Sequence, residues 1–244
     1  MKMNLREKCS ICIPFERSEY DEITTDSKKF RRHINNTIAH FPELFPVKIT
    51  GGYEMKDSRK SKKLCLCIRR ITVADKSYSV RPSFVMPYMT GFVCNVENGL
   101  YLRRFDVPFH GLTHVFGRYP MYWYRLENHL GRNSLVGTTV HSDTALPYDH
   151  PECHRTSNML DRLMQRMDRH LFSTQYFHGS SDTAELNIRG WALIYNFTPS
   201  NPMTIKKYQG KKCPADRLNG SAYSENWLEN LLISASLKDF RCPP

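Results

Sequence analysis

Residues 91–139 constrain the fold of this chain most, because their turn residues and apolar spacing predict three short helices. The first helix is expected at 93–105 and the second between a cap at Asp106 and a closing Gly117. The third is expected at 121–130, after a turn made by Arg118, Tyr119 and Pro120. This succession is typical of a helix-turn-helix module.

The third helix separates its side chains by character. Trp123, Leu126 and Leu130 recur at helical spacing and are expected in the core. A different face carries polar and aromatic residues that suit base edges and phosphates, namely Tyr122, Arg125, His129 and Arg132, with Asn128 beside them. An ordinary three-helix core with a solvated polar face explains the same spacing, so periodicity alone leaves both interpretations open.

The distribution of charge favours a polyanion as partner. The chain has a formal net charge of +11, and the residues before Asp143 hold nearly all of the excess of Lys and Arg over Asp and Glu. Neutralisation of phosphates supplies most of the non-specific affinity of DNA-binding proteins. The basic half is also the half that contains the predicted helix-turn-helix.

The segment before this module predicts a helix and a β-hairpin with basic flanks. Residues 1–27 are expected to be a loosely ordered lead-in, and a helix capped by Asp26 or Ser27 is expected at 28–40. Strands are expected at 64–73 and 78–85, after a flexible basic loop. The side chains that we expect to rest on the DNA backbone are Lys60, Lys62, Lys63, Arg69 and Arg70. A solvated run of charges explains residues 56–63 equally well when they are taken alone. Residues 28–140 thus form the predicted DNA-binding region.

Cysteine usage and hydropathy indicate a cytoplasmic protein, and the expected DNA binding would associate it with the nucleoid. The cysteines are scattered, no signal peptide is visible, and no apolar run is long enough to span a bilayer. Cys9 and Cys12 have the spacing of half a zinc site, but a second pair at that spacing is missing. No metal site is therefore assigned.

The C-terminal part is predicted to be mostly helical. A polar stretch with two prolines, residues 141–155, is expected to be a linker or a deletion junction. Helices are expected at 158–172, 183–197 and 227–237, with a loop at 203–220. The predicted segment comprises residues 156–244.

One motif at the start of this segment carries chemistry. In the stretch Arg155-Thr156-Ser157-Asn158-x-x-Asp161, a carboxylate follows a Thr-Ser-Asn cap on the first turn of a helix. This motif lies in one of four longer blocks, which are IRRITVADKSYSVRPSFVMPYMTG, VPFHGLTHVFGRYPMYWYRLENHLGRNSLVGTTV, RTSNMLDRLMQRMDRHLFSTQYFHG and RLNGSAYSENWLENLLISASL. The blocks resemble a bacterial insertion-sequence transposase family of the DDE, RNase H-like type, which is abundant in cyanobacteria. The resemblance implies DNA-end binding by the N-terminal blocks and makes Asp161 the third catalytic carboxylate.

The departure from that family concerns the other two carboxylates. In such transposases the first two acids lie on a sheet between the DNA-binding region and the final helices. Here only residues 140–155 separate the DNA-binding region from those helices. A single carboxylate cannot hold the pair of Mg²⁺ ions that strand transfer requires. We therefore expect an internally deleted, catalytically inactive copy, with no cofactor, or with Mg²⁺ if it is active.

The resulting prediction is an α+β chain with a helix, a β-hairpin and a helix-turn-helix, followed by helices that remain from an RNase H-like domain without its sheet. Its function would be DNA binding by a transposase-like protein of a mobile element, with double-stranded DNA, including terminal inverted repeats, as partner. One alternative is an active transposase in DNA recombination whose missing acids are unrecognised or come from a second chain. Another is a DNA-binding regulator that inhibits the intact enzyme. A third, which does not bind nucleic acid, is a basic scaffold protein. A homo-oligomer or an association with full-length transposase fits each of them.

Overall fold

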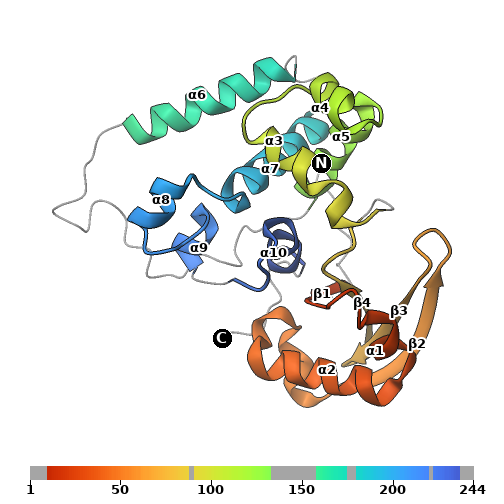
Figure 1. Cartoon of the computed structure of the whole chain (residues 1–244). Helices are drawn as coiled ribbons and strands as arrows, with labels where there is room; N and C mark the ends of the chain where they lie inside the picture. Colours follow the sequence, from red (N-terminus) through yellow and green to blue (C-terminus); the bar gives the residue numbers. More distant parts are fainter. Residues whose placement is uncertain (1–9, 88–90, 133–157, 175–179, 220–221, 237–244) are drawn as a thin grey trace. The chain divides into compact units, whose positions relative to one another are not determined.

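The computed structural model in Figure 1 describes residues 10–87, 91–132, 158–174, 180–219 and 222–236. The described residues fall into two compact units. Unit 1 contains the residues up to Asn95 together with 222–236, and unit 2 contains 96–132 and 158–219. Both helices and a sheet are present, so the predicted α+β class is confirmed.

Unit 1 is built on a four-stranded sheet in the order β1-β4-β3-β2. The strands are β1 (Ser10–Ile13), β2 (Glu54–Ser61), β3 (Leu66–Val73) and β4 (Lys76–Pro82). Strands β2, β3 and β4 form an antiparallel meander, whereas β1 pairs with β4 in parallel, with Ile11 opposite Val80. Strand β2 is one of the two edge strands, and most of its side chains are exposed.

Helices complete the core of unit 1. They are α1 (Tyr20–Thr25), α2 (Ser27–His40) and α10 (Trp227–Ser234), with short 3₁₀ turns at Pro42–Leu44, Val47–Gly51 and Val93–Asn95. Asp26 caps α2, since its Oδ1 accepts a 2.7 Å hydrogen bond from Lys28 N. Phe30 and Ile34 of α2 are buried, and α10 packs on β1. The helix predicted at 28–40 and its cap are confirmed.

Unit 2 is entirely helical in its described residues. Its helices are α3 (Glu97–Arg103), α4 (Phe109–Phe116), α5 (Pro120–Gly131), α6 (Asn158–Ser173), α7 (Ser181–Phe197), α8 (Pro202–Lys207) and α9 (Pro214–Asn219). The closest packing is between α5 and α7. A Cβ on Gly131 would lie 1.8 Å from Leu186 O, and one on Gly190 would lie 2.2 Å from Glu127 O. The two helices therefore meet backbone to backbone, which only glycine allows.

Several predicted elements need correction. The lead-in at 1–27 contains β1 and α1, the basic loop before 64 contains β2, and the loop at 203–220 contains α8 and α9. The predicted first helix at 93–105 starts only at Glu97, after a 3₁₀ turn. Strand β1 and helices α1, α8 and α9 were missed because each has at most six residues, and tertiary packing rather than local propensity holds such short elements. Strand β2 has eight residues and was missed because its polar, basic sequence lacks the apolar alternation of a strand.

Without a covering sheet, the apolar residues of the C-terminal helices would be expected to be exposed. The structure shows such exposure for only some of them. Leu193 and Ile194 of α7 are buried, whereas Leu163 of α6 remains 38% exposed. The predicted junction at 141–155 lies outside the described residues. In the part of the chain that the structure describes, no helix is long and apolar enough to cross a membrane.

Candidate nucleic-acid interface

Helices α4 and α5 occupy the segment that the sequence predicts to be a helix-turn-helix. They are joined by Gly117, Arg118 and Tyr119, and Gly117 closes α4 with a φ of 72°. Trp123 Nε1 donates a 3.1 Å hydrogen bond to Gly117 O, which fixes the turn against α5. Asp106 is not the cap of α4, since that position is taken by Pro108.

The inner side of this pair of helices follows the predicted apolar spacing on α5 but not on α4. Trp123, Leu126 and Leu130 are all buried, as expected. The spacing of Leu112, Val115 and Phe116 likewise predicts an apolar side for the second helix. On α4, however, only Leu112 is buried, while Val115 is 65% and Phe116 37% exposed. The prediction for α4 was wrong at these two residues. A helix of only eight residues packs against α5 with few side chains, and the remaining apolar side chains stay exposed.

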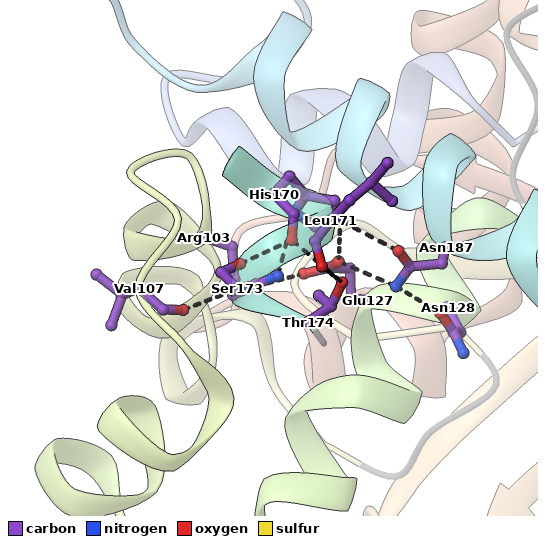
Figure 2. Close-up of polar contacts among 9 residues, drawn as sticks. All are labelled: Arg103, Val107, Glu127, Asn128, His170, Leu171, Ser173, Thr174 and Asn187. Atoms are coloured by element: carbon purple, nitrogen blue, oxygen red, sulfur yellow. Dashed lines mark hydrogen bonds and ion pairs between the residues drawn. The ribbon is translucent and has the colours of Figure 1, made fainter. Parts of the chain in front are cut away.

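A buried polar cluster holds α5 in place, as Figure 2 shows. Arg103 Nε donates to Glu127 Oε2 at 2.7 Å, and both side chains are almost completely buried. Arg103 also donates to Val107 O at 2.6 Å. Asn187 Nδ2 donates to Glu127 Oε1 at 3.3 Å and to Asn128 Oδ1 at 3.2 Å. The single acid of α5 is thereby bonded to both α3 and α7.

His170 of α6 completes the cluster in its neutral form. Its Nδ1 lies 3.2 Å from Arg103 Nη2, which can only donate, so Nδ1 is the acceptor and Nε2 carries the proton. Nε2 then donates to Asn187 Oδ1 at 3.1 Å. Burial lowers the pKa of His170 below its ordinary 6.5, although the nearby Glu127 carboxylate acts in the opposite direction. The hydrogen-bond directions and the pKa shift agree on the neutral ring.

The outer surface of α4 and α5 carries positive charge and no acid. Between Asp106 and the end of α5 the only acidic residue is Glu127, which the cluster buries. Arg118, Arg125 and Arg132 are exposed along this surface. Such a surface attracts phosphates without a competing carboxylate.

The predicted base-reading residues are only partly brought together. Arg125 and Arg132 are exposed, and Tyr122 is half-buried with the Arg118 guanidinium 5.6 Å from its ring centre. His129 is also half-buried, and burial together with Arg132 and Arg125 lowers its pKa. These four residues share the outer side of α5.

Asn128 does not belong to this surface, which corrects the sequence prediction. It is only 8% exposed and its Oδ1 accepts from Asn187. The reason is tertiary, because α7 approaches α5 on the side that carries Asn128 and Gly131. Spacing within α5 alone gave no indication that a second helix would cover that side.

The predicted phosphate-contacting residues of unit 1 divide into two groups. Lys60 on β2 and Lys62 and Lys63 in the following turn are exposed. Arg69 instead donates to Ser27 Oγ and Thr25 O, both at 3.0 Å, and so ties β3 to the helices. Arg70 donates to Asp57 Oδ1 at 2.6 Å and holds the pKa of that carboxyl below its usual range. The two arginines therefore have structural contacts, and the lysines are the exposed group.

The residues considered for metals lie in different settings. Asp161 is exposed on the first turn of α6. Cys12 is buried in β1 and burial raises its thiol pKa, while Cys9 lies outside the described residues. Across the described ranges, no group of three or more His, Cys, Asp or Glu side chains is placed to hold a metal ion.

The Arg103–Glu127–His170–Asn187 cluster was not predicted from the sequence. Its one sequence signal is the position of Glu127, four residues after Trp123 and therefore on the apolar stripe of α5. An acid on a buried stripe predicts a buried cationic partner.

No family model, no curated protein and no solved structure matches this chain.

Proposed function

We propose that this chain is a DNA-binding protein of the transposase type, which contacts duplex DNA through the outer surface of α5 and the turn before it. One observation carries the proposal. The surface of α4 and α5 exposes Arg118, Arg125 and Arg132, while its only acid, Glu127, is buried against Arg103. A helix-turn-helix presents its second helix to the major groove in this way.

The burial of Glu127 has a direct consequence for this function. A carboxylate at the surface of α5 would repel phosphates, whereas here its charge is balanced by the Arg103 guanidinium inside the unit. The same contact ties α5 to α3, so the arginines project from a helix whose position is fixed. A fixed helix loses less conformational entropy when it binds.

The test is the affinity of the full chain for a short duplex, measured by fluorescence anisotropy over a range of salt concentrations. The double variant Arg118→Gly/Arg125→Ala keeps the turn, since glycine accepts the φ of 68° found at Arg118. We expect its affinity to fall by at least about tenfold, the effect of removing one good arginine–base interaction or more. Removal of the same number of charges elsewhere in unit 2, in Lys206→Ala/Lys207→Ala, should change affinity by less than about twofold. Equal effects in both variants would contradict a specific role for α5.

We further propose that the chain lacks strand-transfer activity, because Asp161 is the only residue that matches an acid of the catalytic triad. The competing proposal is an active enzyme with Mg²⁺ as cofactor. Incubation with Mg²⁺ and inverted-repeat DNA should therefore give no nicked product. Nicking that requires Mg²⁺ and disappears in Asp161→Ala would establish the active enzyme instead.

A further inference from the structure

The turn between α4 and α5 exposes an aromatic side chain on a rigid backbone. Tyr119 is 79% exposed, the most exposed of the large hydrophobic residues of the described chain. Among the described residues, its ring and hydroxyl contact no other aromatic ring and make no hydrogen bond. An isolated exposed tyrosine is ordinary, so its surroundings decide what it can do.

The backbone around Tyr119 is held from both sides. Gly117 and Arg118 adopt left-handed φ values of 72° and 68°, and Pro120 fixes the first residue of α5. Trp123 Nε1 bonds to Gly117 O, and Tyr119 O accepts a 2.9 Å hydrogen bond from Tyr122 N. Arg118 is a non-glycine residue in a conformation that costs free energy, and such strain concentrates at functional positions.

The residues around Tyr119 in the sequence expose both apolar and basic side chains, and we call this part of α4, the turn and α5 the apolar tip. Met121 is 53% exposed and Val115 65% exposed, and Arg118 and Arg125 are exposed as well. No acid occurs between Asp106 and the buried Glu127. An apolar protein partner would not need these basic side chains, whereas a nucleic acid supplies both a flat ring to stack on tyrosine and phosphates to pair with arginine.

We infer that Tyr119 stacks on a nucleobase that is out of the helical stack, so that the α4–α5 turn prefers DNA with an unpaired nucleotide over fully paired DNA. This inference rests on the proposed DNA binding by α5 and names the class of DNA that the same surface selects. The rigid turn presents the ring, the arginines hold the flanking phosphates, and Met121 and Val115 cover the edge of the exposed base. Stacking on an aromatic ring tolerates every base, because each has a π-face.

The experiment compares the full chain on a short paired duplex and on the same duplex with one central unpaired 2-aminopurine. We expect the bulged duplex to bind about tenfold more tightly, the lower end of what one base–aromatic stack contributes. The fluorescence of 2-aminopurine should change on binding as the base stacks on the ring. Tyr119→Ala should abolish both effects, so that its affinities for the paired and the bulged duplex become equal. Tyr119→Phe should retain both effects.

A matched control removes a tyrosine elsewhere in unit 2. Tyr208 is 42% exposed at the end of α8, and Tyr208→Ala should leave the preference for the bulge unchanged. Folding of Tyr119→Ala is checked by its helical circular dichroism, and the unaltered chain tests the preference without any substitution. Tyr119 provides no side-chain cap to α5, so its removal should not unfold the helix.

The outcomes separate this inference from the proposed function. Equal affinity for paired and bulged DNA in the unaltered chain would overturn the stacking role and leave DNA binding intact. An absence of salt-dependent binding to either duplex would overturn both. If Tyr119→Ala instead changed the oligomeric state in sedimentation while both affinities stayed constant, the apolar tip would be a contact between copies of the chain, and the inference would be wrong.

Discussion

At the scale of single residues, Glu127 links the core of unit 2 to its surface. Its two carboxylate oxygens accept from Arg103 and Asn187, and all three side chains are buried. Burying an ion pair costs desolvation, so such a pair need not raise stability relative to apolar residues. Its role here is to orient α5 and to keep a negative charge away from the exposed arginines.

Glu127→Gln should destabilise unit 2, because it leaves the Arg103 guanidinium buried without a counter-charge. The free energy of unfolding, measured in urea, should fall by roughly 3 kcal/mol. Glu185→Gln is the control, since Glu185 pairs with Arg189 on the surface of α7 with its own side chain 54% exposed. Loss of that exposed pair should cost less than about 1 kcal/mol. Equal stability of the two variants would show that the buried pair does not hold α5.

His170 should make the stability of the protein depend on pH. Its folded pKa lies below the ordinary 6.5, chiefly because burial favours the neutral ring. Glu127, and less strongly Asn187 and Asp106, favour protonation, whereas the Arg103 guanidinium repels the protonated ring. The unfolded chain therefore binds the proton more readily than the folded chain, and stability is fully present above about pH 6.5 and lost as the pH falls below it.

His170→Gln should flatten this dependence between about pH 7.5 and pH 5, as measured by urea unfolding at each pH. Burial also lowers the pKa of His33 and His129, so part of the dependence should persist. The control is His110→Gln, because His110 is exposed on α4. A pH profile of His170→Gln that parallels the unaltered chain would contradict a neutral buried ring.

At the scale of elements, the contact between α5 and α7 decides which side of α5 is free. Gly131 and Gly190 let the two backbones touch, and the approach covers Asn128 while it leaves Arg125 exposed. The α4–α5 pair is thus one part of a larger helical unit, in which α3, α6 and α7 are joined to α5 through the buried cluster.

Gly190→Ala should disrupt this packing. Its Cβ would lie 2.2 Å from the Glu127 carbonyl oxygen, a backbone atom that cannot move without displacing α5. We expect the free energy of unfolding to fall by about 3 kcal/mol, at the upper end for overpacking. Gly51→Ala, where a Cβ meets nothing within 4 Å, serves as the control and should change stability by less than about 1 kcal/mol. A fully stable Gly190→Ala would show that the two helices pack less closely.

At the scale of the whole molecule, the net charge of +11 should give the proposed DNA binding a strong dependence on salt. In unit 1 the β2–β3 hairpin exposes Lys60, Lys62 and Lys63. Neutralising these three lysines to glutamine should reduce the slope of log affinity against log salt concentration by roughly one for each phosphate that is no longer neutralised, with little effect on sequence preference. A triple variant with an unchanged slope would show that the hairpin does not touch phosphate.

The arrangement of strands and the packed sides of helices were predictable to different extents. The helix at 28–40, the turn at Gly117 and the buried Trp123, Leu126 and Leu130 follow from caps and apolar spacing, which act within a few residues. Strand β1 did not follow from the sequence, because it pairs in parallel with β4 across a long chain separation. The prediction that Val115 lies on the buried side of α4 was also wrong, since a short helix carries little periodic information.

The sequence by itself determined the two helices joined at Gly117, the excess of positive charge and the lack of any acid other than Glu127 on α4 and α5. Only the tertiary structure decided that Glu127 is buried, that Asn128 faces α7 and that Tyr119 is left exposed on a rigid turn. The physical reason is that spacing fixes which residues share one side of a helix, whereas burial depends on which distant segment packs there. In this chain that segment is α7, and two glycines allow its approach.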